Sequence, residues 1–168
     1  MATSELTADR LRALLHYEPT TGIFTNRVHR GSTARAGDVA GCLSTSDGYL
    51  RIRIDGRQYL AHRLAWLHVT GCWPSGEVDH RNGVRTDNRF ANLRDATSSV
   101  NSQNLRAARR DNKTAGLLGV SYMASKGRYR ATICVSGKHL HLGLFTSPEE
   151  AHVAYRAAKR RYHPGCTI

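Results

Sequence analysis

Residues 78–104 read VDHRNGVRTDNRFANLRDATSSVNSQN, in which two short predicted strands flank a polar loop. Residues 77–80 (EVDH) are predicted to form a strand, and 92–96 (NLRDA) the strand that returns beside it. Thr97 is a good cap for a helix over residues 98–108. This part of the chain therefore predicts a β-hairpin followed directly by a helix.

The same stretch carries residue types that suit phosphodiester hydrolysis. Asp79 and His80 end the first strand, and Asn101 lies about one turn into the helix, so a hairpin packed on that helix can bring Asp79 and Asn101 together. Their oxygens suit a hard divalent cation, Mg²⁺ or alternatively Mn²⁺. His80 can accept a proton from water, and Asn92 can orient its imidazole. Spacing alone is equally compatible with an Asp-His pair in an ordinary turn.

A longer stretch, residues 60–104, resembles the HNH homing endonucleases common in phages and mobile introns. The resemblance rests on His-Arg-Leu before a short helix, then Val-Asp-His, the Asn-Gly turn, Thr-Asp-Asn-Arg, Asn-Leu-Arg and Asn-Ser-x-Asn. It implies a ββα-metal fold with His80 as general base, Asp79 as metal ligand and Asn92 as the asparagine that orients the histidine.

The last position of the motif departs from the commonest form of the family. Many members have a second histidine there, whereas this chain has Asn101, with Asn104 as the alternative one turn later. The resemblance then implies one weakly held cation and nicking of one strand rather than a double-strand break. It also implies a cytoplasmic protein of a phage or another mobile element.

Two residues near the motif have weaker signals. His62 begins the helix predicted over residues 62–71, and we expect it to support the hairpin rather than to catalyse. Its neighbour Arg63 is expected to contact a phosphate of the DNA backbone.

The charge of the chain points to nucleic acid as the partner. Its 168 residues contain 25 Lys and Arg against 13 Asp and Glu, a net charge of +12, and residues 94–130 hold eight basic residues and two acids. Phosphate contacts supply most non-specific DNA-binding energy, so double-stranded DNA is the expected partner. RNA is less favoured because no strand carries the cluster of aromatic residues typical of single-strand binders.

Cysteine usage and hydropathy exclude other classes. The four cysteines are widely separated with no Cys-x-x-Cys pair, so no zinc knuckle is expected and the thiols are predicted to be reduced. No secretory signal or membrane-length apolar run is recognised, so no membrane partner is expected. The oligomeric state stays open, with a monomer favoured.

The N-terminal region predicts a helix and a second hairpin. Residues 5–16 have a helical apolar pattern with Thr7 as cap. Residues 49–54 alternate apolar and polar side chains before the turn Asp55-Gly56, which predicts a hairpin with the following residues. Residues 26–48 allow no assignment.

The C-terminal region predicts three strands and a helix. The strands are 119–123, 128–135 and 139–145, and the helix starts at Pro148 after the cap Ser147. Alternation divides the strands into two faces. One face presents Tyr129, Ala131, Ile133, Val135, Leu140, Leu142 and Leu144 to a helix stripe of Ala151, Ala154, Tyr155 and Ala158. The other presents Arg128, Arg130, Thr132, Cys134, His139 and His141.

This segment resembles the ethylene-response-factor type of DNA-binding domain. The motifs are the opening Gly-Val, a Gly-x-Tyr-x-Ala-x-Ile strand, Leu-Gly-x-Phe and a Glu-Glu-Ala helix start leading to Ala-Tyr. The resemblance implies that the sheet reads DNA, here without the tryptophans of plant relatives: Tyr129 stands at one such position and His141 at or near the other. The expected DNA contacts are Lys126, Arg128, Arg130, Thr132, His139 and His141 on the sheet, with Arg109, Arg110 and Lys113 along the linker.

Together these observations predict an α+β protein with four parts. They are an N-terminal helix and hairpin region (1–60), an HNH nuclease module (61–108), a basic linker (109–118) and a three-stranded DNA-binding domain packed on one helix (119–168). The expected function is a metal-dependent DNA endonuclease. The alternative is a DNA-binding regulator whose HNH module is inactive.

Overall fold

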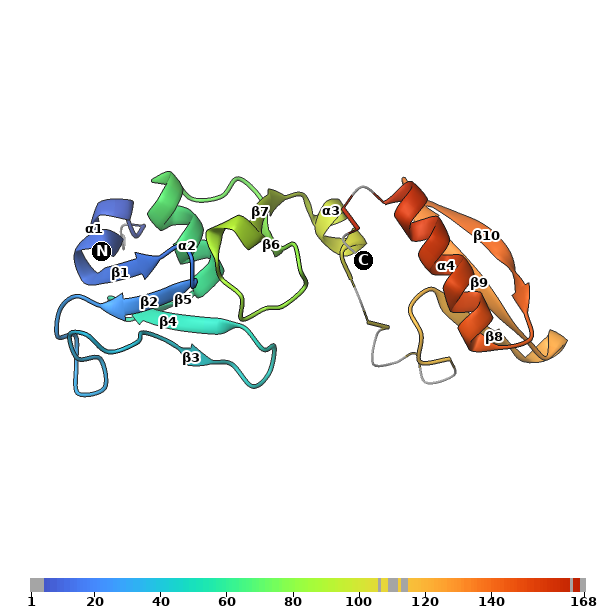
Figure 1. Ribbon diagram of the computed structural model, residues 1–168, viewed down its shortest axis with the longest axis horizontal. Helices are drawn as coiled ribbons and strands as arrows, with labels where there is room; N and C mark the ends of the chain where they lie inside the picture. The colour runs from blue at the N-terminus through green and yellow to red at the C-terminus, as the bar shows by residue number, and fades with distance from the viewer. Residues whose placement is uncertain (1–4, 106, 109–111, 113–114, 164, 167–168) are drawn as a thin grey trace. The chain divides into compact units, whose positions relative to one another are not determined.

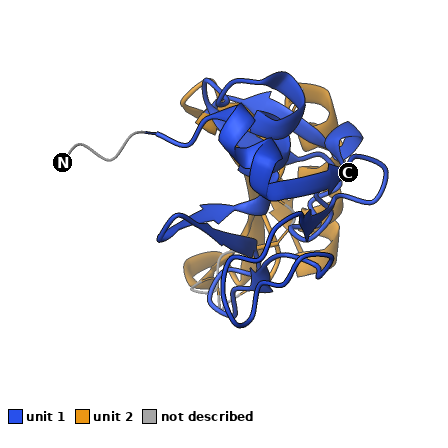
Figure 2. Ribbon diagram, turned by 90° about the vertical axis from the view of Figure 1, so that its left-hand side faces the viewer, with its two compact units in different colours: residues 1–97 blue, residues 98–168 orange. Residues whose placement is uncertain are grey.

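The computed structural model describes residues 5–105, 107–108, 112, 115–163 and 165–166. The chain divides into two compact units, residues 1–97 and 98–168 (Figure 2). Within the described residues, four α-helices and several small antiparallel sheets make up a mixed α/β fold (Figure 1). None of these helices is long and apolar enough to cross a membrane.

The first unit begins with a helix that is shorter than predicted. Helix α1 (Ala8–Leu14) is capped by Thr7, whose side chain accepts a hydrogen bond from the backbone N–H of Arg10. The predicted helix over residues 5–16 is wrong at its end, because the chain turns at Leu15 into strand β1 (Leu15–Glu18). Leu15 and Tyr17 are buried while His16 between them is exposed, which is the alternation of a strand. Strand β1 pairs with β2 (Ile23–Asn26).

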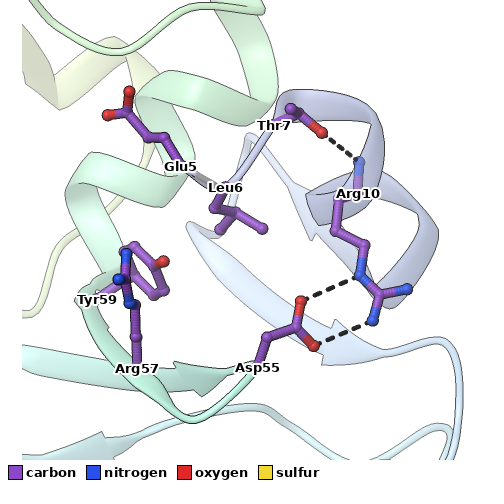
Figure 3. A pocket seen from close by; sticks show the side chains of 7 residues that line it. All are labelled: Glu5, Leu6, Thr7, Arg10, Asp55, Arg57 and Tyr59. Carbon is purple, nitrogen blue, oxygen red and sulfur yellow. Dashed lines mark hydrogen bonds and ion pairs between the residues drawn. The ribbon is translucent and has the colours of Figure 1, made fainter. Parts of the chain in front are cut away.

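The hairpin predicted around Asp55-Gly56 is confirmed. Strands β4 (Leu50–Ile54) and β5 (Arg57–Leu60) pair through a turn in which both central residues have positive φ, 47° and 81°, as a tight type I′ turn requires. The short strand β3 (Cys42–Leu43) pairs with β4 at the other edge. Arg10 donates two hydrogen bonds to Asp55, which fastens α1 to this turn beside a shallow surface pocket (Figure 3).

Helix α2 (Ala61–Thr70) and the second hairpin complete the first unit. The helix ends, as predicted, at Gly71 in the left-handed conformation. Strand β6 (Glu77–His80) pairs with β7 (Leu93–Ala96), and the 3₁₀ helix η1 (Phe90–Asn92) leads into β7. A single hydrophobic core runs from Leu6 through α1, β2, β4 and α2 to Leu93. The β6–β7 hairpin therefore shares its core with the N-terminal elements.

The second unit is a three-stranded antiparallel sheet covered by one helix. Helix α3 (Ser98–Gln103) is shorter than the predicted 98–108. The sheet has the order β10-β9-β8, with β8 (Val120–Met123), β9 (Arg128–Val135) and β10 (Lys138–Phe145). Helix α4 (Pro148–Tyr162) lies across one face (Figure 1) and packs its predicted stripe of Ala151, Tyr155 and Ala158 on the sheet.

A β-bulge changes the predicted faces of β10. His141 pairs with Thr132, but the next pair joins Gly143 to Ala131, so Leu142 is an extra residue and the alternation shifts by one. Leu144 consequently lies opposite Arg130, away from α4, and not beside Leu140 as predicted. Phe145 takes the position on the helix side.

The predicted linker is only partly within the described residues. Arg109, Arg110 and Lys113, the expected backbone contacts, lie outside them. The described residues of this segment pack within the second unit. Asn112 donates hydrogen bonds to the carbonyls of Leu117 and Val120, and Leu117 packs against the hydrophobic core between the sheet and α4.

Candidate active site

The β6–β7 hairpin places Asp79 and His80 on opposite faces of a two-stranded sheet. Successive side chains of a strand alternate, so Val78 and His80 share one face and Asp79 lies on the other. Asp79 pairs across the hairpin with Arg94, and His80 with Leu93. Both Asp79 and His80 are buried, which is unusual for polar side chains at the end of a hairpin.

The His80 imidazole is held by a hydrogen bond to Asn88. Its Nε2 lies 3.2 Å from Oδ1 of Asn88, while the Asn88 side-chain N–H₂ donates to the carbonyl of Thr86 at 3.3 Å. Because the Thr86 carbonyl can only accept, Asn88 must turn its oxygen toward the imidazole. With the amide oxygen in this position, Nε2 is the nitrogen that can donate to Asn88, which favours the tautomer of neutral His80 that is protonated there.

Two neighbouring rings pack against the His80 imidazole. The ring of His62, on α2, lies edge-on to that of His80 with centroids 4.9 Å apart, and Tyr49 packs on both histidines. His62 is 4 % exposed, and burial lowers its pKa to about 3. It is therefore neutral at physiological pH and packs against the His80 ring.

Burial also sets the protonation of His80. Desolvation lowers the pKa of His80 below its ordinary value, and the hydrogen bond that His80 donates to Asn88 acts in the opposite direction without cancelling it. The imidazole is neutral at pH 7 and can accept a proton there. A buried neutral histidine of this kind has the protonation state that a general base needs.

Asp79 is the buried carboxylate of the hairpin. Arg94 donates from Nε and Nη2 to the same oxygen, Oδ2, at 2.9 and 2.6 Å. The next acid along the hairpin, Asp87, is engaged by Arg89 and Asn82, and the Arg89 hydrogen bond is the main reason that its pKa falls to about 2. Asp79 precedes His80 in strand β6, and the charges of both Asp79 and Asp87 act to raise the pKa of His80 against the larger effect of burial.

Asn92 contacts the loop between the two strands, and its expected role in orienting the histidine stays a prediction. Its side chain accepts from the N–H of Asn82 at 3.0 Å and donates to the carbonyl of Asp87 at 2.8 Å, so it closes the loop between the strands. It stands at the end of η1, directed at the loop, while Asn88 contacts the imidazole. Asn88 was overlooked because it looks like an ordinary loop residue, although it is 2 % exposed.

The donor set fits a hard cation that keeps most of its waters. Asp79 offers carboxylate oxygen, and the described residues contain no group of three or more His, Cys, Asp or Glu side chains that would hold a metal tightly. The four cysteines are free thiols and do not contribute. Asn101 lies on α3 in the second unit and Asn104 directly follows that helix, so the convergence of either on Asp79 stays a prediction.

The predicted DNA contacts of the second unit lie mainly on one face of its sheet. We call the face of β8–β10 that is turned away from α4 the open face. Its cross-strand pairs place Arg128, Arg130, Thr132, Cys134, His139, His141 and Leu144 there. Lys126 is exposed in the 3₁₀ turn η2 (Ala124–Lys126) before β9. No ion pair neutralises either arginine within the described part of the chain.

Arg63 is held locally. Its guanidinium donates to the carbonyl of Gly76 at 3.2 Å and lies 5.7 Å from the centre of the Trp73 ring. These contacts fix the chain that enters β6, and a contact of Arg63 with phosphate stays a prediction.

Comparison with known proteins places this hairpin within an enzyme family. Residues 59–103 match a family model described as HNH endonuclease. The matched segment contains α2, the β6–β7 hairpin and α3, and so includes Asp79, His80 and Asn88. This match to one segment of the chain supports an HNH nuclease and suggests nuclease activity on DNA. No curated protein and no solved structure matches the chain.

Proposed function

We propose that the protein is a metal-dependent HNH endonuclease that nicks one strand of double-stranded DNA. The observation that carries the proposal is a buried, neutral His80 whose Nε2 faces the Asn88 oxygen and which directly follows the buried Asp79 in strand β6, within the segment that matches HNH endonucleases. The hairpin and α3 would form the ββα-metal arrangement, with Asn101 as the ligand supplied by the helix.

In this mechanism His80 is the general base. Its Nδ1 takes the proton of the attacking water, while Asn88 keeps Nε2 protonated and the ring in place. Asp79 and Asn101 would hold the cation, which stabilises charge on the phosphate and the leaving 3′ oxygen when bound. A site with so few ligands would hold one cation weakly, and the resemblance to family members whose motif ends in Asn supports nicking.

The open face of the second unit would position the enzyme on DNA. Residues 98–168 contain twelve Lys and Arg against three Asp and Glu, so this unit carries most of the net charge. A sheet that presents Arg128 and Arg130 beside Thr132 and His141 can lie in a major groove, as in other sheet readers. The similarity to ethylene-response-factor domains supports the same role.

A supercoiled plasmid tests the proposal. With Mg²⁺ or Mn²⁺ we expect nicked circles, and EDTA should abolish them. Asp79→Asn, which keeps the shape of the side chain, should lower the rate by at least about 100-fold. Asp55→Asn is the control. It weakens the exposed ion pair with Arg10, which is distant from Asp79 in the sequence, and should nick normally. Absence of nicking with every divalent metal would refute the proposal.

The second candidate is a DNA-binding regulator with an inactive HNH module. The observation in its favour is that Arg94 already occupies Oδ2 of Asp79 and so competes with a cation. The regulator would bind duplex DNA in a gel-shift assay with the full chain and leave the plasmid intact under all metals. The endonuclease would do both.

A further inference from the structure

We infer that the N-terminal β1–β2 hairpin is a positioning element for catalysis: Tyr17 and Gly22 fix Asn88, and Asn88 fixes the tautomer of His80. The inference rests on the proposed role of His80 as general base. The hairpin lies outside residues 59–103, the segment that matches HNH endonucleases. It would therefore be a part of the active site that the family motif does not contain.

Tyr17 holds the backbone of Asn88. The phenol is 2 % exposed, and its hydroxyl donates a hydrogen bond of 2.7 Å to the Asn88 carbonyl. Burial raises the pKa of Tyr17 to about 12, so the hydroxyl stays protonated and acts as a donor. The ring is itself anchored against Phe24 of β2, with centroids 4.7 Å apart. A rigid donor thus faces a loop residue 71 positions away in sequence.

Gly22 holds Asn88 in place because its backbone lies very close to the backbone of that residue. It has φ of +76°, and a Cβ at this position would stand 2.5 Å from the carbonyl carbon of Asn88 and 2.5 Å from the backbone nitrogen of Arg89. Only glycine lets the β1–β2 turn lie so close to the loop. The turn and the tyrosine therefore hold Asn88 through its backbone, while Thr86 holds its side chain.

The contacts of Tyr17 and Gly22 with Asn88 matter because Asn88 lies in an irregular loop. Residues 81–89 have no strand or helix to fix their backbone, and loops of this kind are mobile unless they are tied down. The Asn88 oxygen can select one tautomer of His80 only if it stays in place. Tyr17, Gly22 and Asn88 are thus positioning residues, and the imidazole alone meets the water.

The tautomer can be measured without any nuclease assay. In ¹⁵N NMR of the full chain at about pH 8, above the ordinary histidine pKa of about 6.5, we expect His80 to be protonated at Nε2 alone. Asn88→Ala should populate the Nδ1-protonated form, whereas Asn88→Asp, which keeps an acceptor oxygen, should restore the Nε2 form. An unchanged tautomer in folded Asn88→Ala would overturn the inference.

Nicking kinetics test the two N-terminal residues. Tyr17→Phe should lower kcat about tenfold or more at unchanged KM, as expected for loss of a group that orients a catalytic residue. Tyr59→Phe is the matched control, because the Tyr59 hydroxyl makes no hydrogen bond within the described part of the chain. Equal kcat for the two variants would contradict the role of Tyr17.

A pair of glycines provides the second control. Gly22→Ala should lower kcat more than Tyr17→Phe does, whereas Gly56→Ala has a similar φ of +81° but no atom within 4 Å of the added Cβ and should keep kcat. Equal effects of the two alanines would overturn the role of the turn. If the parent protein does not nick at all, the proposed function fails, while the NMR result still decides whether Asn88 controls His80.

Discussion

Arg94 donates two hydrogen bonds to one oxygen of Asp79 across the β6–β7 hairpin, at 2.9 and 2.6 Å. The two side chains are 15 % and 8 % exposed, so both charges of the pair are largely removed from water. Removing one partner of a buried pair leaves a buried charge and costs more than the pair contributes.

The first prediction concerns the stability of this hairpin. Arg94→Met should lower the free energy of unfolding of the first unit by about 3 kcal/mol. Arg10→Met breaks the exposed pair with Asp55 and should cost under about 1 kcal/mol. Urea titration followed by tryptophan fluorescence measures both, because Trp66 and Trp73 are the two tryptophans of the chain and both lie in the first unit. Equal losses would contradict the burial of the Asp79 pair.

The second prediction concerns acid sensitivity caused by His62. Its folded pKa is about 3, against about 6.5 unfolded. Below pH 6.5 His62 is protonated in the unfolded chain but stays neutral in the folded chain. Its contribution to the free energy of unfolding is therefore complete above pH 6.5 and is lost as the pH falls toward 3. His62→Phe keeps a ring and removes this loss, roughly 3 kcal/mol at about pH 4. Urea titrations at several pH values check it, and parallel pH profiles would contradict it.

The third prediction concerns the contact between Gly119 and α4. A Cβ on Gly119 would stand 2.0 Å from the Tyr155 ring, and φ there is +78°. Gly119→Ala should therefore destabilise the second unit by about 3 kcal/mol or more. Gly127→Ala has φ of +59° and open space around it, so it should cost about 1 kcal/mol. Thermal unfolding followed by circular dichroism distinguishes the two, and similar melting temperatures would contradict the packing of Tyr155.

The fourth prediction concerns DNA binding by the open face. Arg130→Gln should weaken binding to duplex DNA and reduce the slope of log K against log salt by about 1, as for loss of one phosphate contact. Arg156→Gln removes an equal charge from exposed α4 and is the control. Fluorescence anisotropy at several salt concentrations gives both slopes. An equal change in the two variants would show that overall charge, and not the open face, binds DNA.

Much of the fold follows from patterns a few residues long. Asp55-Gly56 predicts its turn, Gly71 ends α2, and the alternation of residues 128–135 reproduces β9 at its observed bounds. Such features depend on neighbours in sequence, so local propensity is sufficient to predict them.

The bulge in β10 shows where that reasoning ends. The leucines at 140, 142 and 144 alternate without interruption, yet one extra residue at Leu142 moves Leu144 to the open face. The available signal was Gly143, because a glycine within a strand often marks a bulge. Pairing with β9 determines the register of β10, and the alternation of the leucines alone does not reveal the shift.

The site shows the same limit. Asp79 and His80 are recognisable from their spacing with Asn92 and Asn101, but the imidazole's partner is Asn88. The Asn88 carbonyl accepts a hydrogen bond from Tyr17, which lies in a strand whose first two residues were expected to be helical. A contact across 71 residues depends on the tertiary fold, and a single sequence contains no direct record of it.

The rate of plasmid nicking by His80→Ala tests the central claim most directly. The measurement compares it with the parent chain at neutral pH and saturating Mg²⁺, after circular dichroism has shown that both are folded. Loss of the general base should slow nicking by about 100-fold or more while affinity for duplex DNA is retained. A variant that nicks as fast as the parent would show that His80 is not the base and would contradict this account of the active site.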